Sequence, residues 1–308
     1  MDKKAKIFVA GHNGMVGSAI CRELRKNGYD NLILKDSKEL DLRNQQMVND
    51  FFKKIQPEYV FLAAAKVGGI MANSTFKADF IYDNLMIQNN IIHSSFKFGV
   101  NKLLFLGSSC IYPKMSPQPI KEEYLLSGYL ESSNEPYAIA KIAGLKLCEY
   151  YREQYQSNFI SLMPTNLYGF NDIFDLNNSH VLPALIRKFH EAKINNTAHV
   201  ELWGSGNPLR EFLFVDDLAE ACLFMMINYN ESMPLNIGTG KDLSILDLAE
   251  TIKNIIGFSG SIKWDSSKPD GTPRKLLDVG KVNSLGWQAK TKLSEGIKKT
   301  YEWYIQNN

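Results

Sequence analysis

Short apolar runs alternate along the chain with longer segments of helical periodicity. The runs end in glycine or polar residues and predict buried strands at residues 6–10, 31–35, 59–65, 103–106 and 159–163. Helical segments fall between them, as at 18–27 and 80–98. Strands that alternate with helices in this way predict an α/β fold with a doubly wound parallel sheet.

A glycine-rich turn follows the first strand. Gly11-His12-Asn13-Gly14-Met15-Val16-Gly17 stands between that strand and the first helical segment. Glycines in this context allow a tight turn, close approach of the backbone to a pyrophosphate, and close packing of the helix whose N-terminus faces the phosphates. The turn therefore predicts a Rossmann-type dinucleotide site, and a turn that binds no ligand is the alternative.

The second strand leads to the position where a Rossmann-type fold reads the adenosine ribose. An acid there favours NAD and a cation favours NADP, and the chain offers both, with Asp36 between Lys35 and Lys38. For the two lysines, ordinary solvated charge is the alternative. The segment Leu40-Asp41-Leu42 is expected on the adenine side.

Polar side chains with acid–base capacity follow the strand at 103–106. Gly107-Ser108-Ser109-Cys110 comes directly after it, and Pro136 opens a helix that carries Tyr137 and Lys141. Tyr137 and Lys141 are four residues apart and share a face, so the ammonium is expected to lower the pKa of the phenol. Ser108, Tyr137 and Lys141 together resemble the catalytic triad of the short-chain dehydrogenase/reductase superfamily.

Two further groups suit proton transfer beside a ketone. Cys110 lies two residues after Ser108, so both point to one face if the strand continues, and His180 opens a helix after a long polar loop. A thiol and an imidazole titrate near physiological pH and can remove and return protons at the carbons next to a ketone. A core cysteine and a helix-capping histidine are the alternative.

A second unit is expected after the strand that ends near Tyr168. We expect residues 1–168 to form the dinucleotide-binding unit, with 215–238 packed back onto it. Residues 169–214 and 239–308 are expected to form a smaller, mixed α/β substrate unit. Trp203 and Arg210 are expected in turns there, where an indole suits stacking on a sugar and a guanidinium suits a diphosphate. A peripheral core tryptophan and a surface ion pair are the alternatives.

Composition and charge indicate which classes of partner the protein is not expected to bind. The 308 residues carry a net charge of +2, with no basic block and no apolar span of about 18 residues, so we expect neither nucleic acid nor a membrane. Four scattered cysteines and the absence of a signal-peptide pattern favour a reduced, cytoplasmic protein. The five histidines lack ligand spacing, so no metal site is expected.

Long motifs across nearly the whole chain closely resemble the GDP-L-fucose synthase family of extended short-chain reductases. They lie at 11–17, 63–70, 107–114, 134–141, 163–169, 178–181, 203–206 and 268–275. The resemblance implies a homodimer that epimerises GDP-4-keto-6-deoxy-D-mannose at C3 and C5. Reduction at C4 by NADPH, with NADH as the other candidate, then gives GDP-L-fucose.

The resemblance also implies roles for individual residues. Tyr137 would give a proton to the C4 oxygen with support from Ser108, Lys141 would bind the nicotinamide ribose, and Cys110 and His180 would be the epimerisation pair. The substrate contacts would be Ser109, Asn166, Lys188, Trp203, Arg210 and Asp270. The cofactor contacts would be Gly11, Asn13, Gly14, Met15, Val16, Gly17, Asp36, Ser37, Asp41, Leu42, Ala63, Ala65, Leu106, Gly107, Ser108, Lys141, Pro164, Asn166, Leu167 and His180.

Two departures from the family pattern keep alternatives open. Asn13 and Ser37 stand where the family usually has arginine, so Lys35 or Lys38 would have to read the 2′-phosphate of NADP. The loop at 169–176 also differs, which leaves a C4 ketoreductase of a modified GDP-sugar, such as a GDP-6-deoxy-4-keto-heptose, as a second hypothesis. A non-catalytic protein that senses dinucleotides is the third.

Overall fold

The fold is centred on one sheet of six parallel strands. The computed structural model describes residues 1–176, 179–268 and 270–308, so Asn178 and Pro269, which belong to two of the motifs, lie outside the described residues. The strand order is β2-β1-β3-β4-β5-β9, and the order reverses between β1 and β3. The strands are β1 (Ile7–Ala10), β2 (Leu32–Ile33), β3 (Tyr59–Leu62), β4 (Lys102–Leu106), β5 (Phe159–Pro164) and β9 (Leu235–Ile237).

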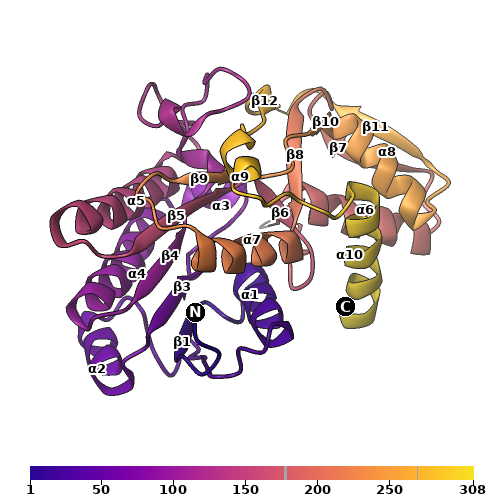
Figure 1. Cartoon of the computed structure of the whole chain (residues 1–308). Coiled ribbons are helices and arrows are strands. Elements are labelled where there is room, and N and C mark those ends of the chain that lie inside the picture. The colour runs from indigo at the N-terminus through magenta and orange to yellow at the C-terminus, as the bar shows by residue number, and fades with distance from the viewer. Residues whose placement is uncertain (177–178, 269) are drawn as a thin grey trace.

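Helices cover both faces of this sheet (Figure 1). Ile7 and Val9 face one core while Phe8 and Ala10 face the other, as alternation along a doubly covered strand requires. One core contains α1 (Met15–Lys26), α7 (Val215–Asn228) and the short α9 (Gly280–Ser284); the other contains α2 (Gln45–Ile55), α4 (Lys77–Lys97) and α5 (Glu135–Tyr155). The short α3 (Ile70–Thr75) precedes α4. The predicted doubly wound α/β fold is therefore confirmed.

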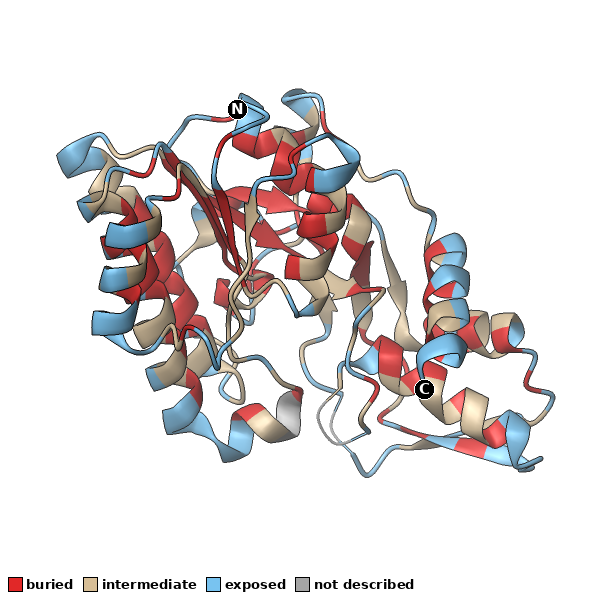
Figure 2. Cartoon of the chain, turned by 90° about the horizontal axis from the view of Figure 1, so that it is seen from below, coloured by how far each residue is buried: buried red, intermediate tan, exposed pale blue. Residues whose placement is uncertain are grey.

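A smaller mixed α/β region lies beside the main sheet and holds a third core (Figure 1). Its strands are β6 (Asn166–Tyr168), β8 (Leu209–Phe214), β10 (Asp242–Ser244) and β12 (Arg274–Lys275), with β8 pairing the other three, and a separate pair of β7 (His199–Trp203) and β11 (Ser261–Asp265). Its helices are α6 (Val181–Ile194), α8 (Ile245–Ile256) and α10 (Leu293–Asn307). Figure 2 shows that the buried residues concentrate in the main sheet and on the inner sides of its helices.

Several predicted strands, turns and loops have different limits in the structure. Trp203 ends β7 and Arg210 lies within β8, so the prediction that both occupy turns is wrong. The second strand is only two residues long, and the polar loop expected at 268–275 ends in the strand β12. α7 packs on α1 and β9 joins the main sheet, although the proposed unit boundaries as a whole stay a prediction. Across the described residues, no helix has the length and apolar character to cross a membrane.

Candidate active site

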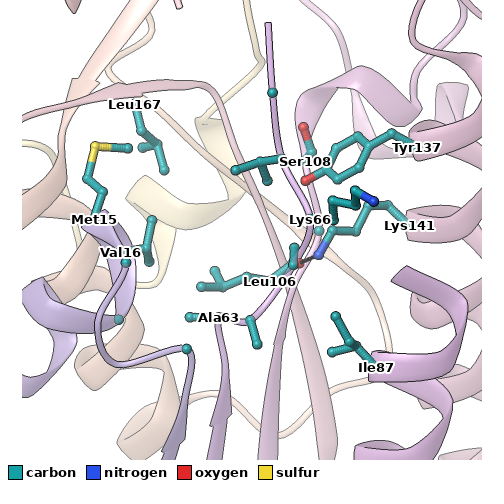
Figure 3. Close-up of a pocket in the computed structure, with 18 of the residues that line it drawn as sticks. Met15, Val16, Ala63, Lys66, Ile87, Leu106, Ser108, Tyr137, Lys141 and Leu167 are labelled. Atoms are coloured by element: carbon teal, nitrogen blue, oxygen red, sulfur yellow. Dashed lines mark hydrogen bonds between the residues drawn. The ribbon is translucent and has the colours of Figure 1, made fainter. Parts of the chain in front are cut away.

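A cavity of about 660 Å³ opens where the strands of the main sheet end. Its wall is formed by residues that follow β1, β3, β4 and β5, among them Gly11, Ala63, Gly107 and Thr165. The carboxyl edge of a parallel sheet, at the point where strand order reverses, is where α/β proteins bind ligands. Figure 3 shows side chains from these elements pointing into the cavity.

At one end of the cavity, the backbone of the glycine turn packs closely against the segment after β3 and against the first turn of α1. Gly11 has a φ of +87°, and a Cβ there would lie 2.7 Å from the Ala64 Cα atom. A Cβ on Gly17 would lie 2.1 Å from the Gly11 carbonyl oxygen, so α1 sits directly against the turn. Gly14 caps α1, whose N-terminus borders the cavity. These residues fit a dinucleotide, and all twenty predicted cofactor residues line this cavity.

The adenosine end of the cavity carries paired charges. Lys35 lines it but forms an ion pair with Glu39 at 2.5 Å, and Lys38 is not part of the lining. Asp36 accepts hydrogen bonds from the backbone N–H groups of Glu39 and Lys38, which lowers the pKa of its carboxyl.

Ser108, Tyr137 and Lys141 meet in the middle of the cavity. The Tyr137 ring points toward Ser108, and Lys141 lies beneath it (Figure 3). The Lys141 ammonium is 5.7 Å from the Tyr137 ring centroid and donates a hydrogen bond of 2.8 Å to the Leu106 carbonyl. Burial lowers the pKa of Lys141 to about 8.

The expected lowering of the Tyr137 pKa is wrong for this structure. Burial, and secondarily the neighbouring Cys110, raise the pKa of Tyr137 instead. The reason is that Lys141 directs its charge to the Leu106 carbonyl, so desolvation of the phenolate outweighs attraction to the ammonium. The phenol is thus protonated at neutral pH.

Cys110 and His180 also line the cavity, but Cys110 does not reach it on a continuation of the strand. β4 ends at Leu106, and Cys110 lies in the short 3-10 helix η1 (Ser109–Ile111), so no continuing strand aligns it with Ser108. His180 is the N-cap residue of α6, but its side chain makes no capping hydrogen bond and is exposed to the cavity. Desolvation by the surrounding chain, together with the charge of Lys275, lowers the pKa of His180.

The six predicted substrate residues divide into two groups. Ser109 and Asn166 line the cavity, whereas Lys188, Trp203, Arg210 and Asp270 do not. Asp270 accepts hydrogen bonds from the backbone N–H and the hydroxyl of Ser205. Burial lowers the pKa of Arg210, and the negative charge of Asp270 partly opposes this effect. Trp203 is 59% exposed, so it is not a peripheral core residue.

A family model describes most of the chain. Residues 7–238 match the model of the NAD dependent epimerase/dehydratase family. The chain belongs to that family. Within it, the chain is 59% identical to GDP-L-fucose synthase 1 of Arabidopsis thaliana, over 99% of this chain and 95% of the relative.

Solved structures of related reductases have the same fold. A GDP-6-OMe-4-keto-L-xylo-heptose reductase from C. jejuni superposes with a TM-score of 0.95 at 44% identity, covering 100% of this chain and 99% of that one. MlghC, a GDP-mannoheptose C4 reductase from Campylobacter jejuni with NADP bound, gives a TM-score of 0.92 at 46% identity, with 99% of each chain covered.

Sequence reasoning missed several residues that line the cavity. The charged and amide side chains among them are Arg43, Lys66, Asn73, Asp83, Asn134 and Lys275. Arg43 forms ion pairs with Asp41 at 2.9 Å and Asp83 at 3.5 Å. Of these residues, Lys66, Asn134 and Lys275 lie inside motifs that carry the family resemblance, and Arg43 directly follows the predicted adenine contact. In the part of the chain that the structure describes, no cluster of three histidine, cysteine or acidic side chains is suited to a metal ion.

Proposed function

We propose that this family member reduces the C4 ketone of GDP-4-keto-6-deoxy-D-mannose after epimerising C3 and C5, and so forms GDP-L-fucose. One observation carries the proposal. Ser108, Tyr137 and Lys141, which suit ketone reduction, share a single cavity with Cys110 and His180, which suit proton exchange beside a ketone. The identity of 59% to a GDP-L-fucose synthase over nearly the full chain supports this substrate class.

Reduction uses the protonated phenol. Tyr137 is protonated at neutral pH, so the phenol can give its proton to the C4 oxygen while Ser108 donates a hydrogen bond to the same atom. Lys141, charged below a pH of about 8, stabilises the phenolate that remains. NADPH, when bound beside the glycine turn, supplies the hydride to C4.

Epimerisation uses the acidity that the ketone gives to its neighbouring carbons. One member of the Cys110–His180 pair, in its base form, takes the proton from C3 or C5, and the electrons of the C–H bond move toward the ketone oxygen. The other member, in its acid form, returns a proton from the opposite face and the ketone forms again. The lowered pKa of His180 favours its neutral form, which suits the role of the base.

The nucleotide of the substrate would extend from the cavity toward β7 and β8. We assign the diphosphate to Lys188 and Arg210, whose pKa values are both lowered by burial, and the guanosine to Trp203 and Asp270. An exposed indole offers a stacking face, and an exposed carboxylate offers two acceptors. The hydrogen bonds from Ser205 to Asp270 hold that carboxylate in place.

For the cofactor, we propose NADPH as the main reductant with measurable use of NADH. The related reductase with NADP bound supports NADPH. Asn13 and Ser37 offer no charge to a 2′-phosphate, and Lys35 is already paired with Glu39. Arg43 is then the cation best placed to meet the phosphate, although it shares its charge with Asp41 and Asp83. Discrimination between the two cofactors is therefore expected to be modest.

A C4 ketoreductase of a GDP-4-keto-heptose is the second candidate. The two heptose reductases from Campylobacter jejuni, at TM-scores of 0.95 and 0.92, support it. The loop at 169–176, which departs from the usual family pattern, also leads to His180. Under this hypothesis Cys110 and His180 stay in the cavity without exchanging protons.

We further propose a homodimer that works in the cytoplasm. The packed helices α4 and α5 expose large apolar side chains, with Tyr82 at 62%, Tyr150 at 55% and Ile139 at 41%. Exposed apolar groups on neighbouring helices are typical of an interface between subunits. All four cysteines are free thiols, as in a reducing compartment. Light scattering would give the oligomeric state directly.

The test of the proposed function compares substrates. GDP-4-keto-6-deoxy-D-mannose should oxidise NADPH in the presence of the wild-type protein and yield GDP-L-fucose, and Tyr137→Phe should lower the rate by ~100-fold or more. Tyr137→Phe should still bind NADPH, as measured by fluorescence titration. Turnover of a GDP-4-keto-heptose alone would favour the second candidate. NADPH binding without turnover of either sugar would favour the dinucleotide sensor.

A further inference from the structure

The cationic side chains that line the cavity are almost all paired within the protein. The partners and distances are Lys35 with Glu39 at 2.5 Å, Arg43 with Asp41 at 2.9 Å, Lys66 with Asp83 at 2.8 Å, and Lys141 with the Leu106 carbonyl at 2.8 Å. Lys275 differs from these four, because within the described ranges its ammonium has neither a hydrogen bond nor an ion pair. An ammonium in a protein cavity normally finds an acceptor, so Lys275 is available to a ligand.

The backbone around Lys275 is fixed from several directions. Lys275 pairs with Arg210 in the ladder between β12 and β8. The next two residues are anchored as well, since the Leu276 N–H donates to Gln118 at 2.8 Å and the Leu277 N–H donates to the buried Glu211 carboxylate at 3.0 Å. The point from which the Lys275 side chain enters the cavity is therefore well defined.

Lys275 borders the part of the cavity where proton exchange would occur. Lys275 is half-buried and lines the cavity with Cys110 and His180. Burial lowers the pKa of Lys275; Cys110 and the Glu131 carboxylate oppose this effect and Arg210 adds to it. The charge of Lys275 in turn contributes to the lowered pKa of His180. Lys275 is therefore electrostatically coupled to both members of the exchanging pair.

We propose that Lys275 is a catalytic residue of epimerisation, whose ammonium donates a hydrogen bond to the sugar and faces the negative charge of the enolate. This inference rests on the proposed function. When the base takes a proton from C3 or C5, the C–H electron pair becomes part of the new C=C bond and the carbonyl π electrons become a lone pair on the ketone oxygen. The enolate carries one negative charge until the acid returns a proton to carbon. Lys275 keeps all of its protons during both transfers.

The other charged groups of the cavity have different tasks. Lys141 already donates to the Leu106 carbonyl beside Tyr137, on the reducing side of the site. Lys35, Arg43 and Lys66 are neutralised by carboxylates. A cation without a partner in the protein stabilises a developing anion more than one that must first leave its partner. The role should hence be specific to the enolate and absent from hydride transfer.

The experiment separates enolisation from hydride transfer. Enolisation is followed by NMR as deuterium incorporation at C3 and C5 of GDP-4-keto-6-deoxy-D-mannose in deuterated water without NADPH. Hydride transfer is followed as NADP⁺ reduction during oxidation of GDP-L-fucose, which requires no proton exchange at carbon. The variants are Lys275→Met, which removes the charge, and Lys275→Arg, which retains it. Lys263→Met on β11, which lies outside the cavity lining, is the matched control.

Lys275→Met should slow deuterium incorporation by ~100-fold or more while oxidation of GDP-L-fucose changes by less than ~10-fold. Lys275→Arg should recover part of the exchange, and Lys263→Met should match the wild type. Equal losses in both assays, or wild-type exchange in Lys275→Met, would overturn the inference. If the wild type itself incorporates no deuterium, the epimerase part of the proposed function fails, and the role of Lys275 falls with it.

Discussion

Gly14 and Gly17, in the turn after β1, should differ sharply in what an added methyl group does. At Gly17 the new Cβ would lie 2.1 Å from the Gly11 carbonyl oxygen, and an ordinary contact begins at about 3.4 Å, so α1 and the turn must separate by about 1.3 Å. At Gly14 the nearest atom is 3.5 Å away, and the residue has φ −78° and ψ 170°, which alanine adopts without strain.

These distances translate into opposite effects on stability. Overpacking costs about 1–3 kcal/mol, and at Gly17 the cost falls in the upper part of that range because the nearest atoms that the new Cβ would meet belong to the backbone. Alanine regains up to about 1 kcal/mol of helix propensity. We expect Gly17→Ala to lose about 1–2 kcal/mol, which lowers Tm by roughly 2–8 °C. Gly14→Ala should change Tm by less than about 1 °C, since unfolded-state entropy offsets the small loss at the helix cap.

Thermal unfolding without cofactor and fluorescence titration with NADPH together test this reasoning. Gly17→Ala should have both a lower Tm and a lower affinity for NADPH than the wild type. Gly14→Ala should keep its stability but bind NADPH at least about 10-fold more weakly, because a glycine in this turn allows close approach of the backbone to the pyrophosphate. A Gly17→Ala protein with wild-type Tm and NADPH affinity would refute the claim that this contact fixes α1 against the turn.

Three further changes have expected outcomes. Arg43→Ala should weaken NADPH binding by about 5-fold in fluorescence titrations and leave NADH binding unchanged, since only the 2′-phosphate of NADPH would contact that charge. An equal loss of affinity for both cofactors would contradict this role. The reduction rate should fall as pH rises through about 8, where Lys141 loses its charge, and Lys141→Arg should move the fall to higher pH. Lys102→Met should lower the unfolding free energy by about 2 kcal/mol in urea, because the ammonium of Lys102 caps α7 by donating to the carbonyls of Met225, Met226 and Tyr229; an unchanged midpoint would show that the cap contributes nothing.

The sequence predicted the parts of the fold that depend on local pattern. The apolar runs before Gly11 and Gly107 are strands, and the turns that follow them face the cavity, because burial on both faces demands apolar residues and sharp exits demand glycine. The placement of Tyr137 and Lys141 on one helix face followed from helical geometry alone.

The rest depended on contacts between distant residues. Lys275 reaches the cavity only because β12 pairs with β8, and a two-residue strand leaves no periodic signal. The pKa of Tyr137 depends on where Lys141 directs its ammonium, which sequence spacing does not determine. For Trp203 a signal was present, since His199–Trp203 alternates exposed and buried positions as a half-buried strand does.

The central claim is that one cavity performs both epimerisation and reduction. Its most direct test is an NMR measurement of the wild-type protein with GDP-4-keto-6-deoxy-D-mannose and NADPH in deuterated water. The account predicts GDP-L-fucose with deuterium at C3 and C5. A product reduced at C4 that carries no deuterium at either carbon would contradict it.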